Sequence, residues 1–161
     1  MAIDTERFRQ RPTLFFQDGV RTIDYLSTRA DIDPDRIGYM GISYGSVAIA
    51  PPLLTMEPRI RAAVLAASGV WVWPVPIAAP TMDIVNYAPR IHVPILMVNG
   101  RYDSLLPREL SQKRLFELLG TPAADKREFI YDGGHYVYPH SQVAKEVGDF
   151  FDKYLGPVNR E

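Results

Sequence analysis

The sequence predicts an α/β fold in which a parallel sheet of about four strands is covered by helices on both faces. Short apolar runs suited to buried strands alternate with helical segments along the chain, and this alternation favours a parallel sheet. Turn clusters separate the elements, and the 161 residues include 14 prolines. Because no internal repeat or linker is visible, we expect a single domain over residues 1–161.

Each element has its own signal in the sequence. An apolar run after the turn Asp33-Pro34-Asp35-Arg36 predicts the first strand. A buried strand is predicted before Arg101, and another strand is predicted before Asp132. Small residues after Tyr44 predict a helix that lies close to the sheet, although Pro51-Pro52 should end or kink it after about two turns. The expected strands are 36–42, 61–67, 95–100 and 126–131, and the expected helices are 12–28, 44–56, 107–119 and 140–155, with a long loop at 68–92.

The most informative motif is Gly41-Ile42-Ser43-Tyr44-Gly45, which lies where the first strand turns into a helix. A Gly-x-Ser-x-Gly at such a junction is typical of a nucleophile elbow, a strained turn that lifts a serine hydroxyl above the carboxyl end of a sheet. A side chain at either glycine is expected to collide with the neighbouring strand or helix. We interpret Ser43 as a catalytic nucleophile, and the alternative is an ordinary serine in a Gly-rich turn.

A serine nucleophile needs a base, and the base needs an orienting partner. Asp103 and His135 each lie just past the carboxyl end of a predicted strand, which is the edge where open α/β sheets place their sites. The chain order Ser43, Asp103, His135 is that of serine hydrolases with a nucleophile elbow. Asp132 is the second candidate for the acid, but it lies too close to His135 in sequence to orient the ring comfortably.

The other histidines have weaker signals. His92 precedes a strand, on the edge away from the expected site, and His140 precedes the last helix. His135 and His140 together do not make a metal site, because the chain has no cysteine and no carboxylate pattern that would complete one. We therefore expect neither a metal nor a cofactor.

Together these motifs resemble the C-terminal half of an α/β-hydrolase, in the branch with dienelactone hydrolase-like, acetyl-xylan-esterase-like and prolyl-oligopeptidase-like enzymes. The resemblance runs from about Val20 to Pro157 and implies a truncated α/β-hydrolase fold. It also implies hydrolysis of esters, lactones, thioesters or peptides through a covalent acyl-enzyme, without a cofactor. The absence of cysteine separates the chain from the dienelactone hydrolases proper. The residues that carry the resemblance are 24–26, 33–38, 41–45, 94–103 with Pro107, and 133–135.

The sequence departs from this family because the first four strands of such a hydrolase have no room in it. One oxyanion donor is expected to be the N–H of Tyr44, and the second would come from a loop after the missing third strand. Losing one such donor costs about 10²–10³ in turnover. We expect a weak catalyst unless a partner chain, Tyr102 or an N–H from the loop at 69–80 takes this role.

The missing strands also leave the elbow strand at the edge of the sheet. An apolar edge at 37–42 invites pairing with another chain. We therefore expect a homo-oligomer joined at or near this strand, or a fragment that needs its missing half, and residues 8–16 offer an alternative cover.

The long loop after the second strand is the expected site of substrate selection. It carries Trp71 and Trp73 in an aromatic and proline cluster, which we interpret as a pocket wall; the alternative is that the tryptophans fill core space or a subunit interface. Tyr102 and Tyr136 are also expected to contact substrate, and Tyr44 to serve as both wall and oxyanion donor.

The sequence as a whole predicts a carboxylesterase that cleaves short-chain esters through an acyl-enzyme on Ser43. The alternatives are a prolyl-oligopeptidase-like peptidase and a catalytically idle hydrolase fragment that serves as a dimerisation or regulatory module. A formal net charge of −1 does not suggest a nucleic-acid partner, and no apolar stretch suggests a signal peptide or a membrane span. Because the chain has no cysteine, the cytoplasm is the expected compartment.

Overall fold

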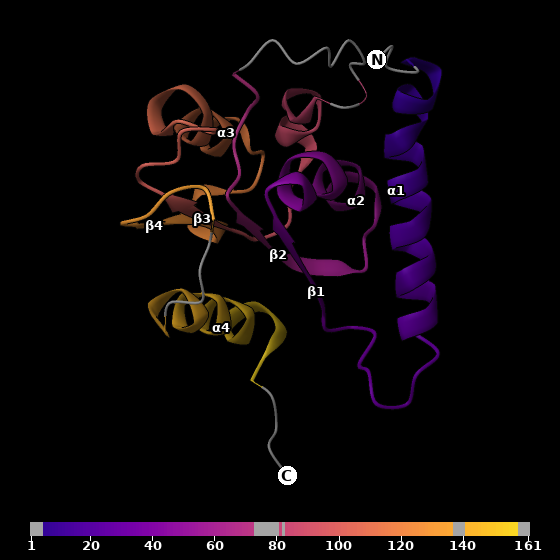
Figure 1. Cartoon of the computed structure of the whole chain (residues 1–161). Helices are drawn as coiled ribbons and strands as arrows, with labels where there is room; N and C mark the ends of the chain where they lie inside the picture. The colour runs from indigo at the N-terminus through magenta and orange to yellow at the C-terminus, as the bar shows by residue number, and fades with distance from the viewer. Residues whose placement is uncertain (1–4, 73–80, 82, 137–140, 158–161) are drawn as a thin grey trace.

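Four parallel strands form one sheet in the order β1-β2-β3-β4 (Figure 1). The computed structural model describes residues 5–72, 81, 83–136 and 141–157. The strands are β1 (Ile37–Ile42), β2 (Ile60–Ala66), β3 (Ile95–Gly100) and β4 (Lys126–Tyr131), and the helices are α1 (Thr5–Leu26), α2 (Ala50–Met56), α3 (Lys113–Leu118) and α4 (Ser141–Leu155). The predicted α/β fold with a four-stranded parallel sheet is confirmed.

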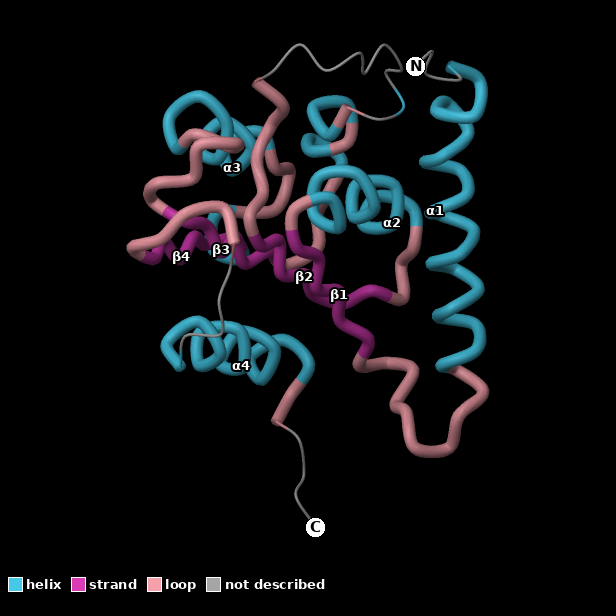
Figure 2. The backbone as a smooth tube through the Cα atoms, in the orientation of Figure 1, coloured by secondary structure: helices cyan, strands magenta, loops and turns pink. Residues whose placement is uncertain are grey.

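The helices lie in two layers, with α1, α2 and α3 on one face of the sheet and α4 on the other (Figures 1 and 2). Alternate residues of β2 face the two layers: Leu65 packs in the same cluster as Leu53 of α2, whereas Val64 packs in the cluster of Phe150 of α4. Residues 62–66 of β2, Ala67 directly after it, and residues 95–98 of β3 are fully buried. This sandwich fixes the carboxyl ends of the strands, from which the candidate site is built.

The first helix begins earlier than predicted. Pro12 was expected at its first position, but α1 begins at Thr5 and holds Pro12 in its interior. The expected start at residue 12 is therefore wrong. Proline removes one backbone hydrogen bond from a helix, and the residues before it are mostly good helix formers, Glu6, Arg7, Arg9 and Gln10 among them.

The second helix continues through Pro51-Pro52, which was expected to end or kink it. The chain after Ser43 first makes a π-helical turn, Gly45–Ile49, in which the N–H of Ala50 donates to the carbonyl of Gly45. The prolines then occupy the first positions of α2, which runs on to Met56. Prolines in the first turn of an α-helix cost no hydrogen bond, because the N–H groups of that turn have no partner within the helix. The π-helical turn before α2 places Pro51 and Pro52 in such a first turn.

The third helix has the same construction, with a π-helical turn, Arg108–Gln112, before α3. The described part of the predicted loop at 68–92 contains two short 3₁₀ turns, Ile84–Asn86 and Ala88–Arg90. Among the described residues no helix is long and apolar enough to cross a membrane.

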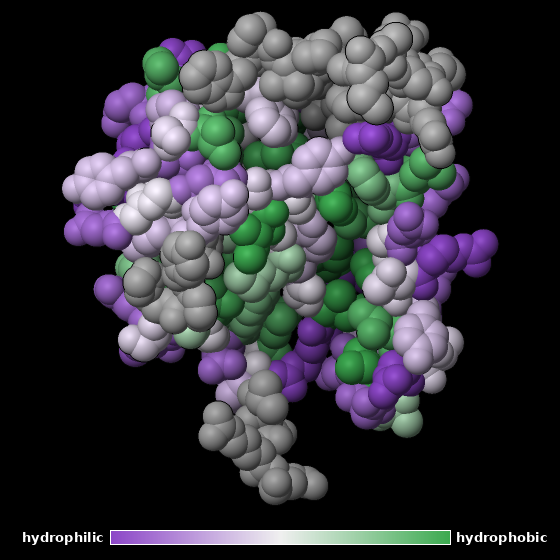
Figure 3. All heavy atoms as spheres, in the orientation of Figure 1, coloured by the Kyte–Doolittle hydropathy of each residue, from purple (hydrophilic) through white to green (hydrophobic). Residues whose placement is uncertain are grey.

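Strand β1 is an edge of the sheet and pairs with β2 along its whole length. Two of its apolar side chains are half exposed, Met40 at 47% and Ile42 at 49%. Hydrophobic residues accordingly lie at the surface over this side of the sheet, between α1 and α4 (Figure 3). The edge therefore presents an apolar strand with one unpaired side within the described part of the chain.

Candidate active site

Ser43 sits on a strained turn between β1 and the following helix. Its φ of 51° is in the left-handed region, which non-glycine residues rarely adopt. The N–H of Ser43 donates to the carbonyl of Ala66 at 2.9 Å, and its carbonyl accepts from the N–H of Ser46 at 2.9 Å and of Val47 at 3.0 Å. These bonds hold the strained conformation.

Only one of the two glycines in the motif is required by packing. A Cβ at Gly41 would lie 2.7 Å from the backbone of Gly45, so any side chain there would push the helix away from the strand. A Cβ at Gly45 would meet only the hydroxyl of Tyr39 among the described residues, at 3.9 Å. The expected collision at Gly45 is therefore wrong, because this position faces the end of the Tyr39 side chain and not the backbone of β1.

Two polar side chains support the turn from within. The hydroxyl of Ser46 is fully buried and donates to the carbonyl of Ser43 at 2.7 Å. The hydroxyl of Tyr39 donates to the carbonyl of Gly45 at 2.7 Å. Burial raises the pKa of Tyr39 to about 12, so this hydroxyl keeps its proton and remains a donor at neutral pH.

The imidazole of His135 lies over the serine, with Nε2 at 2.7 Å from the Oγ of Ser43. It comes from the loop after β4, and this loop is fixed at two carbonyls. The carbonyl of Gly133 accepts from the N–H of Tyr102 at 2.9 Å, and that of Gly134 accepts from the hydroxyl of Tyr131 at 2.9 Å. The pKa of Tyr131 is raised, first by burial and then by the negative charge of Asp103, so this hydroxyl also remains a donor.

The loop of His135 approaches the end of β3 so closely that Gly100 is required there. A Cβ at Gly100 would lie 2.1 Å from the carbonyl oxygen of Gly134 and 2.5 Å from that of Gly133. At Gly134 itself, a Cβ would meet no atom within 4 Å among the described residues. The position of the His135 loop thus depends on the absence of a side chain at Gly100.

We expect Gly100→Ala to lower the free energy of unfolding by about 1–3 kcal/mol, because overpacked sites cost that much. The matched control is Gly134→Ala, which adds the same methyl group to the facing loop, at a position where a Cβ meets no described atom within 4 Å. This variant should be as stable as wild type. Urea denaturation of both variants measures the difference. Equal stability of the two variants would contradict the packing at this loop.

Asp103 is buried behind His135 and accepts three hydrogen bonds. Its Oδ2 lies 2.8 Å from the Nδ1 of His135. Its Oδ1 accepts from the backbone N–H groups of Leu105 and Leu106, both at 2.9 Å. The Asp103 side chain is fully buried and that of His135 is 11% exposed. The carboxylate is therefore fixed from one side by backbone and aims its other oxygen at the ring.

Asp132, the second candidate for the acid, lies elsewhere. Its side chain is 76% exposed and pairs with Arg101 at 2.8 Å. The structure thus brings Ser43, His135 and Asp103 into one hydrogen-bonded series and leaves Asp132 at the surface.

The predicted substrate contacts are spread around this series. Tyr136 is 73% exposed, and its ring meets that of His135 edge-on at 5.9 Å. Trp71 is partly buried against Val47, Ala48 and Leu106. Trp73 and His140 lie outside the described residues.

Two of the predicted oxyanion donors, Tyr44 for the first position and Tyr102 for the second, differ in their backbone. The N–H of Tyr44 is at the start of the helix, where backbone donors have no partner within the helix, and the ring of Tyr44 packs edge-on against Phe15 at 5.9 Å. The N–H of Tyr102 donates to Gly133, and its side chain is 70% exposed. The structure therefore leaves Tyr44, and not the backbone of Tyr102, as a donor for a bound oxygen.

Sequence reasoning missed the residues that hold the site together, chiefly Tyr39, Ser46 and Tyr131. Each makes a side-chain hydrogen bond to a backbone carbonyl of the elbow or of the His135 loop. Only Ser46 has a local signal, since it lies three residues after Ser43 at the start of a helix. The bond of Tyr131 depends on a bend of the loop that no local pattern specifies.

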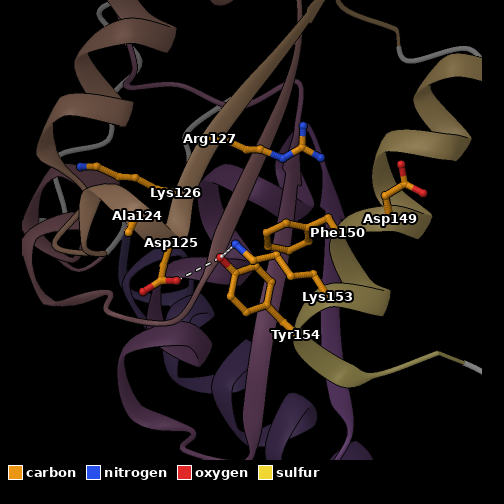
Figure 4. Close-up of a pocket in the computed structure, with 8 residues that line it drawn as sticks. All are labelled: Ala124, Asp125, Lys126, Arg127, Asp149, Phe150, Lys153 and Tyr154. Carbon is orange, nitrogen blue, oxygen red and sulfur yellow. Dashed lines mark hydrogen bonds between the residues drawn. The ribbon is translucent and has the colours of Figure 1, made fainter.

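Two other features of the described residues bear on possible binding sites. No group of three or more His, Cys, Asp or Glu side chains among them could hold a metal. A hollow of about 240 Å³ lies between β4 and α4 (Figure 4). Its charged groups are engaged within the chain: Lys126 donates to the carbonyls of Phe116 and Leu119, and Tyr154 bonds Asp125 and Lys153. These lining groups therefore already have partners within the chain.

Comparison with known proteins gives a partial family match and a shared fold. The model of the prolyl oligopeptidase family matches residues 9–82, which include the elbow. A cold-adapted esterase from an Arctic intertidal metagenomic library superposes with a TM-score of 0.72 at 23% identity, over 89% of this chain and 59% of the esterase. The chain has the α/β-hydrolase fold. The predicted resemblance is thereby confirmed.

Two further solved structures share the fold of this chain. An acylaminoacyl peptidase in complex with Z-Gly-Gly-Phe-chloromethyl ketone gives a TM-score of 0.69 at 19% identity, over 91% of this chain and 28% of that one. Acetyl xylan esterase 1 from Thermoanaerobacterium gives 0.64 at 20% identity, over 86% and 51%.

The α/β-hydrolase chain also has a relative in Mycobacterium tuberculosis, an uncharacterised protein found in two strains. It is 30% identical over 141 residues, which are 82% of this chain and 49% of the relative. The chain thus spans about half the length of the curated relatives it matches.

Proposed function

We propose that the chain is a serine hydrolase, and specifically a carboxylesterase that cleaves short-chain esters through an acyl-enzyme on Ser43. The observation that carries the proposal is the unbroken hydrogen-bonded series Ser43 Oγ, His135 Nε2, His135 Nδ1 and Asp103 Oδ2, with links of 2.7 and 2.8 Å. The strained φ of Ser43 supports it, because backbone strain of this kind is concentrated at functional sites.

The first half of the reaction follows from the proton positions that the series requires. Asp103 accepts a hydrogen bond from the Nδ1–H of His135, so Nε2 carries the lone pair that faces the Ser43 hydroxyl. As Oγ attacks the ester carbonyl carbon, its proton moves to Nε2, and the negative charge of Asp103 stabilises the imidazolium. The C–O bond to the alcohol then breaks, and Nε2–H protonates the leaving oxygen.

In the second half, water replaces the alcohol. Nε2 takes a proton from water as its oxygen attacks the acyl carbon, and the proton returns to Oγ when the acyl bond breaks. The N–H of Tyr44 stabilises the oxyanion in both halves, supported by the partial positive charge at a helix N-terminus. This assigns Ser43 as nucleophile, His135 as base and acid, and Asp103 as the orienting anion.

The substrate part of the proposal rests on the surroundings of the serine. Trp71 and Tyr136 are assigned as apolar walls of the acyl site. Proteins named as esterases are among the structures with this fold. A peptidase is the second candidate, since the prolyl oligopeptidase family model matches and an acylaminoacyl peptidase shares the fold.

A substrate series separates the two candidates. The purified chain would be assayed with p-nitrophenyl acetate, butyrate and octanoate, and with the p-nitroanilides of acetyl-alanine and acetyl-phenylalanine. We expect the largest kcat/KM with acetate or butyrate. A larger kcat/KM with either anilide would favour the peptidase and overturn the esterase.

We also infer that a second copy of the chain pairs along the β1 edge, where Met40 and Ile42 are half exposed. An apolar strand with an unpaired side is a template for another strand. We expect Met40→Lys to reduce the molar mass in solution from a dimer or larger assembly to a monomer, because a charged side chain at an edge opposes pairing.

Light scattering after size-exclusion chromatography measures this change. Met56→Lys is the control, since Met56 is 51% exposed at the end of α2 and not on the edge strand. A monomeric wild type, or an equal response of both variants, would contradict pairing at β1.

A further inference from the structure

We propose that Gln112 is a positioning residue, a clamp whose side-chain amide holds the loop that carries Asp103 in the conformation that serves His135. The inference rests on the proposed function for its effect on turnover. Its geometric part concerns the loop alone and is tested separately below.

The clamp spans the loop from end to end. Gln112 is fully buried in the π-helical turn before α3. Its single amide nitrogen donates to the carbonyl of Gly100 at 3.0 Å and to the carbonyl of Leu106 at 2.9 Å. Gly100 is the last residue of β3 and Leu106 is the last residue that bonds Asp103. One side chain therefore fixes both ends of a loop with Asp103 at its centre.

Closing the loop creates the environment of the Asp103 carboxylate. Its Oδ1 accepts from the N–H of Leu105 and of Leu106, which are adjacent to the clamped carbonyl. The loop's own backbone bond between Asp103 N and Gly100 O is long, at 3.4 Å. The Gln112 amide is thus the shorter link across the loop, and it determines where the two backbone donors stand.

The chemistry of a carboxamide suits this task. An amide nitrogen carries two N–H groups in one plane, so it can serve two carbonyls at once, which neither an apolar residue nor a single hydroxyl at this site does. Its Oε1, in contrast, makes no hydrogen bond among the described residues. Burying an amide whose oxygen has no hydrogen bond costs free energy. The two bonds donated by the nitrogen offset this cost, and they explain why a polar residue occupies this buried position.

The neighbouring turn residue shows that the clamp is specific to Gln112. Ser111 is equally buried, but its hydroxyl donates to the carbonyl of Val70 at 2.6 Å, on the other side of the turn. The π-helical turn therefore directs two adjacent polar side chains to two different loops, and only Gln112 reaches the loop of Asp103.

Gln112→Met is the variant that tests the clamp, because methionine has a similar length and no N–H. Thr121→Val is the matched control. Thr121 is also buried, and its hydroxyl contacts two carbonyls, Ile91 at 3.2 Å and Val93 at 2.8 Å, before the start of β3 and far from the site. Its loss removes a comparable buried polar contact without touching the Asp103 loop. Gln112→Asn, whose shorter amide reaches one carbonyl only, replaces Gln112→Met if the latter does not fold.

The first readout needs no turnover. The Nδ1 proton of His135, hydrogen-bonded to Asp103, gives a far-downfield proton resonance, identified by its loss in Asp103→Ala. We expect Gln112→Met to abolish or shift this resonance and Thr121→Val to leave it in place. An unchanged resonance in folded Gln112→Met would overturn the inference, whatever the activity of the chain.

The second readout is kinetic. With p-nitrophenyl acetate we expect Gln112→Met to lower kcat by about 10- to 100-fold, as misplacement of a reacting group does, with KM almost unchanged. In an Asp103→Ala background the same substitution should have almost no further effect, because Gln112 acts through Asp103. Additive losses would overturn the inference. If the resonance responds but wild type and Ser43→Ala hydrolyse equally slowly, the clamp stands and the proposed function fails.

Discussion

Ser43→Ala is expected to lower kcat for p-nitrophenyl acetate by about 10³-fold or more. Removing the serine of a complete protease triad costs about 10⁶ in kcat. An oxyanion hole with one donor fewer makes the starting kcat about 10²–10³-fold lower. The loss of the serine then has a correspondingly smaller effect on kcat. The remaining loss reflects the proton transfer from Oγ to His135, which alanine makes impossible.

The control for this variant is Ser141→Ala, which removes an exposed hydroxyl at the start of α4. Its rate should equal that of wild type. Both proteins would be compared by initial rates after their folding is verified by circular dichroism. Equal rates for wild type and Ser43→Ala would show that the hydrolysis does not use this serine.

Asp103→Asn is expected to lower kcat by up to about 10⁴-fold, as the corresponding change does in a well-studied serine protease. Asparagine keeps the shape of the side chain, and its oxygen can still accept from Leu105 and Leu106. The amide nitrogen would then face Nδ1 of His135 and favour the tautomer with the proton on Nε2. That tautomer has no lone pair for the serine proton.

Asp132→Asn is the matched control, because Asp132 lies near His135 in sequence and its side chain is 76% exposed. Removing its charge should change kcat by less than about twofold, since exposed ion pairs contribute little. Steady-state kinetics of both variants with the same ester test the choice between the two acids. A larger loss in Asp132→Asn than in Asp103→Asn would contradict the arrangement described above.

Much of the fold was predictable because its signals are local. The strands 95–100 and 126–131 were predicted with the bounds that the structure has, since each ends in apolar or small residues closed by turn residues. The positions of Ser43, Asp103 and His135 followed from the strand ends, because parallel strands bring their carboxyl ends to one edge. The family resemblance added the chain order of the three residues.

The parts that were not predicted depend on contacts between distant residues. A π-helical turn precedes α2, which begins with a proline pair, and another precedes α3, which has no proline, so the prolines alone do not specify such a turn. Gly100 faces a loop more than thirty residues away, so its requirement is visible only when the two backbones meet. Gly45 is the opposite case. The motif predicts a close contact there, but a Cβ at this position would meet only the hydroxyl of Tyr39 among the described residues.

The central claim is that Ser43 is a nucleophile activated by His135, and covalent labelling tests it most directly. The chain would be treated with a fluorophosphonate, which reacts with activated serines, and the adduct located by mass spectrometry of its peptides. We predict one adduct per chain, on Ser43, that is absent from Ser43→Ala and forms far more slowly in His135→Ala. No adduct on wild type, or an adduct on another residue, would contradict the account.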